Sequence, residues 1–181
     1  MEFKETDLKG CYILQPKIFN DKRGYFVENY NKKTFFKATG LDINFVQDNE
    51  SRSQKGVLRG LHYQLGEHAQ AKLIRVSKGK VLDVVVDLRK NSQTFGHKFS
   101  IVLSAKNKTQ LFIPRGFAHG FLVLEDNTTF NYKCDNYYNK DAEAGIIYND
   151  KDLNIDWQLT SNNLIISEKD LVLPEFKNAK L

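Results

Sequence analysis

The chain has 181 residues, of which 41% are hydrophobic and 27% charged, and its formal net charge is +5 at pH 7. These values are typical of a folded globular protein and argue against disorder, and the length suits one domain over residues 1–181. No apolar run approaches the ~18 residues of a membrane helix, so we expect a cytoplasmic protein with no membrane partner.

The first element that the sequence predicts is a short helix over residues 32–39, with Gly40 as its C-terminal cap. The next is a strand-like segment, Leu58-Arg59-Gly60-Leu61-His62-Tyr63-Gln64, in which a glycine interrupts the pattern. A glycine at such a place indicates a bulge that redirects its neighbours. Without a bulge, strict alternation would put Arg59 and His62 on opposite faces of the strand.

A β-hairpin follows, with arms at 72–77 and 81–88 around Lys78-Gly79. The second arm has one strongly apolar face, made of Leu82, Val84, Val86 and Leu88. Further strands are expected at 98–103, 110–113, 120–124 and 128–134. Strands that recur about every ten residues are typical of a sandwich or barrel, so the expected fold class is all-β: an antiparallel β-barrel with short peripheral helices.

Two of the four histidines lie in distinctive settings. His62 is in the segment just described, and His119 lies in Pro114-x-Gly116-x-x-His119, a spacing that resembles the second signature of the cupin superfamily. Cupin metal sites usually contain a His-x-His pair, but here Gln64 takes the second position. Two histidines alone make a poor metal site, so we expect no metal. The alternative is a ligand set completed by His68 or Glu67.

Several other side chains have both a structural and a chemical interpretation. In the structural interpretation, Arg23, Arg59 and Lys72 are solvated surface charges. In the chemical interpretation, the guanidinium groups of the two arginines bind phosphate and the ammonium of Lys72 stabilises an enolate oxygen. Tyr132 shares an inward strand face with Phe130 and Cys134, where it either packs in the core or donates a proton. Both cysteines of the chain are expected to be buried free thiols.

Together the motifs resemble the dTDP-4-dehydrorhamnose 3,5-epimerase family, and the likeness runs in order from about residue 3 to about residue 173. The motifs that carry it are Asp21-x-Arg23-Gly24-x-Phe26-x-Glu28, Gln47-Asp48-Asn49-x-Ser51-x-Ser53, Leu58-Arg59-Gly60-Leu61-His62-Tyr63-Gln64, Ile113-Pro114-x-Gly116-Phe117-Ala118-His119-Gly120-Phe121 and Tyr132-Lys133-Cys134.

The resemblance implies a cupin-like jelly roll, a homodimer, and catalysis on dTDP-4-keto-6-deoxy-glucose without metal or cofactor. By the same likeness His62 matches the catalytic base, Asp170 its carboxylate partner and Tyr132 the general acid. Lys72 and His119 match residues around the keto sugar. The remaining substrate-binding positions that the resemblance implies are Arg23, Phe26, Glu28, Gln47, Asn49, Arg59 and Tyr138.

Three alternatives stay open at the level of sequence. One is a 3-epimerase or 5-epimerase of a related dTDP-4-keto-6-deoxy sugar, another is a ketoisomerase, and the third is a nucleotide-sugar-binding cupin without catalysis. The sequence contains neither a G-x-G-x-x-G motif nor a phosphate loop, which argues against nicotinamide chemistry. Its lysines are dispersed, which argues against a nucleic-acid partner.

Overall fold

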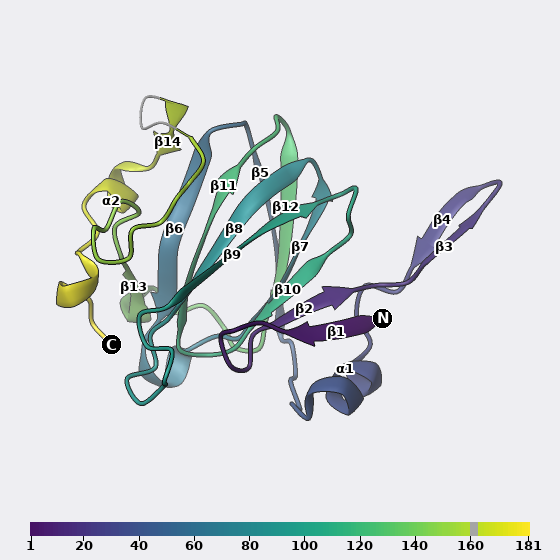
Figure 1. Ribbon diagram of the computed structural model, residues 1–181, viewed down its shortest axis with the longest axis horizontal. Coiled ribbons are helices and arrows are strands. Elements are labelled where there is room, and N and C mark those ends of the chain that lie inside the picture. Colours follow the sequence, from purple (N-terminus) through teal and green to yellow (C-terminus); the bar gives the residue numbers. More distant parts are fainter. Residues whose placement is uncertain (160–162) are drawn as a thin grey trace.

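Two sheets packed face to face make up the body of the protein (Figure 1), and the computed structural model describes residues 1–159 and 163–181. The first sheet contains, in spatial order, β1 (Glu2–Glu5), β2 (Tyr12–Gln15), β10 (Gln110–Ile113), β7 (Lys72–Lys78), β12 (Thr128–Cys134) and β5 (Gln47–Ser53). The second contains β13 (Glu143–Gly145), β6 (Val57–Gln64), β11 (Phe117–Val123), β8 (Lys80–Asp87) and β9 (Lys98–Ser104). The two-residue strand β14 (Ile165–Ile166) pairs with β6 in parallel, and the other ladders are antiparallel.

The expectation of an all-β fold with short peripheral helices is confirmed. The sheets form a jelly-roll-like sandwich, whereas the strand spacing suggested a closed barrel. The described part of the chain explains this difference, because β1 and β5 end the first sheet, β13 and β9 end the second, and no ladder joins these edges. The space between the sheets is therefore open at the margins.

Helix α1 (Lys32–Thr39) has the bounds that the sequence predicted. The side chain of Asn31 accepts a hydrogen bond from the N–H of Thr34, and Gly40 ends the helix in the left-handed region with φ 73°. Phe35 anchors the helix on the outer face of the first sheet, in a cluster with Leu14, Leu73 and Phe112. Helix α2 (Glu168–Leu171) is a single turn, and among the described residues there is no helix with the length and apolar character needed to cross a membrane.

Strand β8 is buried on both faces, although the sequence pattern predicted one apolar face. Val81 and Val85 point into the core between the sheets, together with Ile74, Leu111 and Phe130. The opposite face is covered by described residues that follow β12, drawn in yellow-green in Figure 1, and these include Ile146, Leu153 and Trp157. Each fully buried Val or Leu side chain contributes roughly 1.5–3 kcal/mol of transfer free energy, so this second layer fixes β8 firmly.

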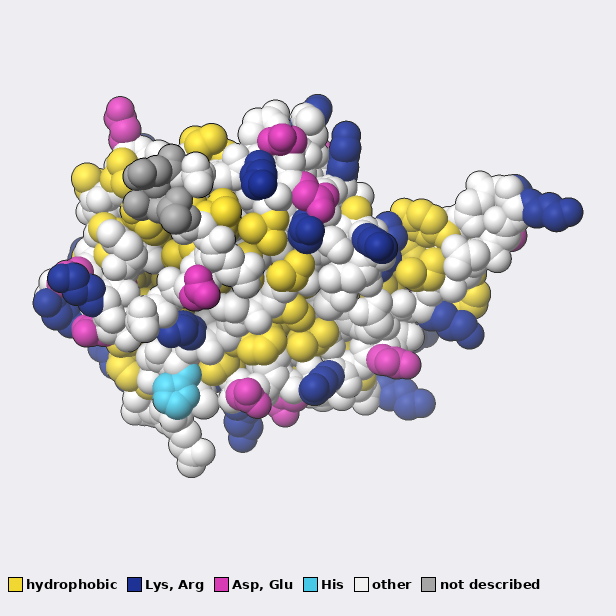
Figure 2. All heavy atoms as spheres, turned by 45° about the horizontal axis from the view of Figure 1, so that its top comes forward, with side chains coloured by type: hydrophobic (Ala, Val, Ile, Leu, Met, Phe, Trp, Pro, Cys, Tyr) yellow, Lys and Arg dark blue, Asp and Glu magenta, His cyan; other side chains and the backbone are white. Residues whose placement is uncertain are grey.

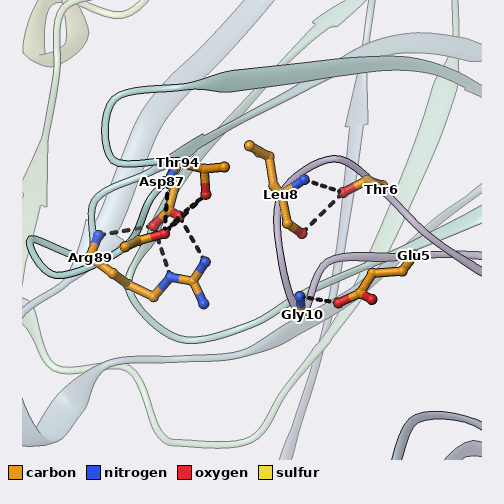
Figure 3. Close-up of polar contacts among 8 residues, drawn as sticks. Glu5, Thr6, Leu8, Gly10, Asp87, Arg89 and Thr94 are labelled. Atoms are coloured by element: carbon orange, nitrogen blue, oxygen red, sulfur yellow. Dashed lines mark hydrogen bonds and ion pairs between the residues drawn. The ribbon is translucent and has the colours of Figure 1, made fainter.

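A buried carboxylate fixes the end of β8 and the loop that follows (Figure 3). Asp87 is fully buried and accepts hydrogen bonds from Arg89 Nη2 at 2.7 Å, Ser92 Oγ at 2.6 Å and Thr94 Oγ1 at 2.7 Å. Burial alone would raise the pKa of Asp87, but the hydrogen bonds from Arg89, Ser92 and Thr94 hold it below its ordinary value. The loop is therefore tied to the sheet by an ionised group.

A two-stranded hairpin, β3 (Ile18–Asp21) and β4 (Gly24–Val27), projects from the body and pairs with neither sheet (Figure 1). We call residues 18–27 the arm. Its large apolar side chains are exposed: Phe19 by 51%, Tyr25 by 57% and Phe26 by 67%. Figure 2 shows hydrophobic side chains gathered along it. Exposed aromatic side chains on a projecting element are typical of a protein–protein contact.

Candidate active site

A β-bulge at Gly60 turns Arg59 and His62 to the same side of strand β6. The ladder with β11 pairs His62 with His119 and Arg59 with Phe121, and the register shifts between these pairs. Gly60 lies at the shift with φ +112°, and a Cβ on it would be 2.6 Å from the carbonyl oxygen of His119. The bulge that the sequence predicted is confirmed.

A cavity of about 660 Å³ lies between the two sheets where they are open. Its walls come from strands β5, β7 and β12 of the first sheet, strands β6 and β11 of the second, and the segment 165–170. Seven of the predicted site residues line it: Asn49, Arg59, His62, Lys72, His119, Tyr132 and Asp170. The fold thus brings together residues that are up to 121 positions apart in the chain, from 49 to 170.

His62 forms a dyad with Asp170. The distance from His62 Nε2 to Asp170 Oδ1 is 2.8 Å, and the second carboxylate oxygen accepts the backbone N–H of Gly60 at 3.3 Å. Burial alone would raise the pKa of Asp170, but the hydrogen bonds from His62 and Gly60 hold it below its ordinary value. Asp170 is therefore an anion that holds the proton of His62 on Nε2.

The C-terminal segment delivers Asp170 to this position. Pairing of β14 with β6 places the segment beside the strand that carries His62. Helix α2 then starts at Ser167, whose Oγ accepts the N–H of Asp170 at 3.2 Å. This cap fixes the turn that directs the carboxylate toward the imidazole.

His119 forms a second dyad with Asp83, which the sequence analysis did not single out. His119 Nε2 lies 2.9 Å from Asp83 Oδ2, and Asp83 is fully buried. Burial raises the pKa of Asp83, while His119 and Lys72 oppose that shift. The signal for Asp83 was present in the sequence, since an acidic residue shares the inward face of β8 with Val81 and Val85.

Lys72 and Tyr132 lie on adjacent strands, β7 and β12, of the first sheet. Lys72 Nζ is 5.9 Å from the centre of the Tyr132 ring, and none of the ion pairs between described residues includes Lys72. Burial lowers the pKa of Lys72 and raises that of Tyr132. Tyr132 points inward with Phe130 and Cys134, as the alternation predicted, and it faces the cavity from the sheet opposite His62.

An adjoining hollow of about 310 Å³ contains two more predicted residues, Gln47 and Tyr138. The N–H of Tyr138 donates to Gln47 Oε1 at 3.0 Å, and its hydroxyl donates to Glu143 Oε2 at 2.9 Å. Glu143 also pairs with Lys169 at 2.6 Å. Burial alone would raise the pKa of Glu143, but Lys169 and Tyr138 hold it below its ordinary value. The sequence analysis missed both Glu143 and Lys169, which lie in the three-residue strand β13 and the single-turn helix α2, elements too short to show a pattern.

Three predicted residues lie away from the cavity. Arg23 is 90% exposed and pairs with Asp21 at the tip of the arm, and Phe26 is exposed on the same arm. Glu28 lines a separate hollow of about 430 Å³ beside Arg75. The fold of this chain therefore does not bring these three side chains to His62.

The two cysteines are free and buried, as expected. Burial raises the pKa of Cys11 to about 12 and that of Cys134 to about 11. Within the described residues, no three His, Cys, Asp or Glu side chains gather as a group that could hold a metal ion. Gln64 instead accepts the N–H of Asn139 at 2.9 Å.

Comparisons with known proteins agree with this geometry. Residues 5–178 match the family model described as dTDP-4-dehydrorhamnose 3,5-epimerase. The chain is 50% identical over 179 residues to a dTDP-4-dehydrorhamnose 3,5-epimerase of Shigella flexneri, covering 99% of this chain and 98% of the relative.

Solved structures are similar over almost the whole chain. A dTDP-4-dehydrorhamnose 3,5-epimerase from Elizabethkingia anophelis has a TM-score of 0.95 and 55% identity, covering 98% of this chain and 97% of that one. A dTDP-6-deoxy-D-glucose-3,5-epimerase from Legionella pneumophila, in complex with dTDP-4-keto-L-rhamnose, has a TM-score of 0.93 and 45% identity, with 98% and 93% coverage. The expected cupin-like jelly roll is thereby confirmed.

Proposed function

Because the chain belongs to the dTDP-4-dehydrorhamnose 3,5-epimerase family, we propose a division of its reaction among the residues of the cavity. The reaction converts dTDP-4-dehydro-6-deoxy-D-glucose to dTDP-4-dehydro-L-rhamnose, an isomerisation in dTDP-L-rhamnose biosynthesis. It inverts C3 and C5, the two carbons beside the C4 ketone. Each inversion removes a proton from one face of the sugar and returns a proton to the other.

His62 is the base in this proposal. Its Nε2 is bonded to the anionic Asp170, so the lone pair available to the substrate is on Nδ1. When Nδ1 takes a proton from carbon, the imidazolium that forms is stabilised by Asp170. General-base catalysis of this kind contributes roughly 10²–10⁴-fold to a rate.

Lys72 stabilises the enolate. Removal of a proton beside the ketone moves negative charge onto the C4 oxygen, and a positioned cation in a desolvated site lowers the energy of that charge. The ammonium of Lys72 lines the cavity, and none of the described carboxylates pairs with it. It is therefore available to the substrate oxygen.

Tyr132 is the acid, and its position relative to His62 is the observation that carries the proposal. The two side chains face one cavity from different sheets, so they approach a bound sugar from opposite sides. Because burial raises the pKa of Tyr132, the phenol keeps its proton at neutral pH and can donate it. Inversion requires this opposition, because one side chain reaches only one face of the ring.

The remaining cavity residues hold the substrate. Arg59 has a guanidinium that suits the diphosphate, and Asn49, Gln47 and Tyr138 extend from the cavity into the adjoining hollow, where the nucleoside is placed. His119, held by Asp83, donates or accepts at the sugar.

Solvent exchange tests the division of roles. The substrate is incubated in heavy water with the wild type, His62→Ala or Tyr132→Phe, and NMR follows deuterium and configuration at C3 and C5. We expect His62→Ala to abolish exchange and inversion together. Tyr132→Phe keeps the base, so exchange should outrun inversion at one or both carbons. Normal exchange by His62→Ala, or normal inversion by Tyr132→Phe, would contradict the assignment. Deuterium at only one carbon with the wild type would identify a monoepimerase.

Arg23 and Phe26 lie on the arm, away from the cavity of their own chain. We propose a homodimer in which each arm extends to the cavity of its partner, with Arg23 near the diphosphate. The exposed aromatic side chains of the arm, and its lack of pairing with either sheet, support this arrangement. Glu28, at the base of the arm, belongs to the same contact.

Mixing two inactive variants tests the arm. In a heterodimer of His62→Ala and Arg23→Ala protomers, one site has both defects and the other has none if the arm acts on its partner. Random exchange of subunits should then restore about one quarter of wild-type activity. If Arg23 acts within its own protomer, every site keeps one defect and no activity returns. Size-exclusion chromatography with light scattering measures the dimer itself.

Three expectations stay predictions. They are one domain over residues 1–181, a cytoplasmic location, and catalysis without a metal or cofactor.

A further inference from the structure

Two loops outside the cavity hold each other beside the hollow that contains Tyr138. One is the 3-10 turn Gly66–His68, and the other spans residues 135–142. Asn136 Nδ2 donates to the carbonyl of Glu67 at 2.8 Å, and Gln70 Nε2 donates to the carbonyl of Asn136 at 2.8 Å. The first loop therefore positions the second, on which Tyr138 lies.

The contact between His68 and Asn139 differs from these because it depends on protonation. Asn139 Oδ1 accepts the N–H of Asp141 at 2.9 Å, where it caps the 3-10 turn Lys140–Ala142. The amide nitrogen of Asn139 must therefore face His68, and it lies 3.1 Å from His68 Nε2. An amide nitrogen only donates. Hence His68 Nε2 accepts this hydrogen bond, and the ring must be neutral with its proton on Nδ1.

Protonation would give the same ring nitrogen a different partner. A proton on Nε2 faces the N–H of Asn139, which is repulsive, whereas Glu67 Oε1 lies 3.7 Å from Nε2 and accepts it. The side chain of Glu67 is exposed to solvent. As a class, imidazole side chains change charge between about pH 5 and 8.

No other described carboxylate is placed to pair with His68 instead of Glu67. The titratable and charged groups on the loop packed against His68 are Asp135, Tyr137, Tyr138, Lys140, Asp141 and Glu143. Of the carboxylates in the described residues, only that of Glu67 lies within 4.0 Å of a nitrogen of His68. Asp135 accepts from Ala71 N–H and Arg115, and Glu143 pairs with Lys169.

We propose that neutral His68 is a positioning residue for the nucleotide: through Asn139 it helps to hold the loop of Tyr138 in place, and protonation of His68 removes this one contact and loosens the loop. The inference rests on the proposed role of Tyr138 in binding the nucleoside. Gln47 and Glu143 also hold Tyr138, so this loosening weakens binding without abolishing it. The KM of the substrate should rise while kcat is unchanged.

Calorimetric titration with dTDP tests the proposal between pH 5.5 and 8. His68→Gln is the matched variant, because its side-chain oxygen accepts from Asn139 at every pH and does not titrate. We divide the dissociation constant of the wild type for dTDP by that of His68→Gln at each pH. In this ratio, the effects of protonating dTDP and the groups that both proteins share cancel. We expect a ratio near one at pH 8 and wild-type binding weaker by roughly threefold to tenfold at pH 5.5, the range for one net hydrogen bond.

Further variants separate the possible failures. His68→Ala lacks the acceptor. At pH 8 its dissociation constant for dTDP, divided by that of His68→Gln, should equal the ratio that the wild type shows at pH 5.5. Glu67→Gln removes the anion that favours the protonated ring, so the loss should begin at lower pH. If the ratio of wild type to His68→Gln is constant over the pH range while Tyr138→Ala binds dTDP weakly, the role of His68 is overturned and that of Tyr138 stands. Unchanged binding by Tyr138→Ala would instead remove Tyr138 from the nucleotide site and the inference with it.

Discussion

Replacement of Gly60 by alanine tests the bulge that aligns the site. At φ +112° an L-residue is strained by about 1–3 kcal/mol. The new Cβ would also lie 2.6 Å from the carbonyl oxygen of His119 and 2.7 Å from Cα of Gly120. Both are backbone atoms of β11, so relief requires a shift of the strand, which costs a further 1–3 kcal/mol or so. The expected total is about 4 kcal/mol.

The substitution should lower both stability and activity. A protein of this length loses roughly 2–4 °C in Tm per kcal/mol, so the Tm should fall by about 8–16 °C. Separation of β6 from β11 also displaces His62 and His119, and a shift near 1 Å costs about 10²-fold in rate. Calorimetry and the NMR assay of inversion measure the two effects.

Gly40→Ala is the control for the strain alone. Gly40 has φ +73° at the end of α1, and a Cβ there would meet no atom within 4 Å. It should cost about 1 kcal/mol, the strain of a left-handed L-residue, and leave the rate unchanged because no residue of α1 lines the cavity. If Gly60→Ala were as mild as Gly40→Ala in both measurements, the argument from close strand contact would be wrong.

Three other predictions follow from the site and the core. Asp170→Asn should keep the fold but lower kcat by roughly 10²–10⁴-fold, because the amide does not hold the base tautomer of His62 or stabilise its cation; a rate within tenfold of wild type would contradict this. Asp87→Asn should lower the free energy of unfolding at pH 7 by about 3 kcal/mol. Since the pKa of Asp87 is depressed from 3.8, its contribution is present above that pH and lost as the pH falls below it, so urea unfolding should differ less between the two proteins at pH 3. Activity should survive exhaustive chelation with EDTA, and loss with recovery by one divalent ion would contradict the expected absence of a metal.

The sequence predicted many of the elements whose residues face a hydrophobic core, but it missed β2, whose Leu14 is fully buried. Strands β9, β10 and β12 lie within a residue of their expected bounds, and α1 matches fully. For β11 the predicted strand began at Gly120, three residues after the first residue of the strand, Phe117. Periodicity works for these segments since burial selects apolar side chains at regular intervals.

Strand β5 shows why part of the fold was missed. Its sequence, Gln-Asp-Asn-Glu-Ser-Arg-Ser, has no apolar residue. One face lines the polar cavity through Asn49 and Ser51, and the other face points to solvent. A strand that builds a binding site therefore lacks the pattern by which strands are recognised. The arm escaped prediction for a related reason, since its apolar residues cover no core of the same protomer.

The candidate site was predicted as far as short motifs reach. His62, His119 and Tyr132 came from local patterns and from resemblance, and their convergence on one cavity followed from the fold. Glu143 and Lys169 act through partners distant in sequence, which no local pattern records, whereas Asp83 stood out only as an acidic residue on the inward face of β8. The resemblance assigned Arg23, Phe26 and Glu28 to substrate binding without indicating that they lie on or beside the arm, away from the cavity.

The rate at which the backbone amides of the arm exchange hydrogen should depend on the state of assembly. A two-stranded ribbon without a third strand is marginally stable in water, and a hydrogen bond of 2.8 Å from Lys108 Nζ to the Tyr25 hydroxyl joins this one to the body. In a dissociated protomer its backbone amides should exchange hydrogen almost as fast as those of an unfolded chain, whereas contact with a second copy should protect them. Under the proposed dimer, dilution would remove that protection and the catalytic rate at the same concentration. Hydrogen exchange at residues 18–27 would then report, in one experiment, both the association of the subunits and the completion of the site.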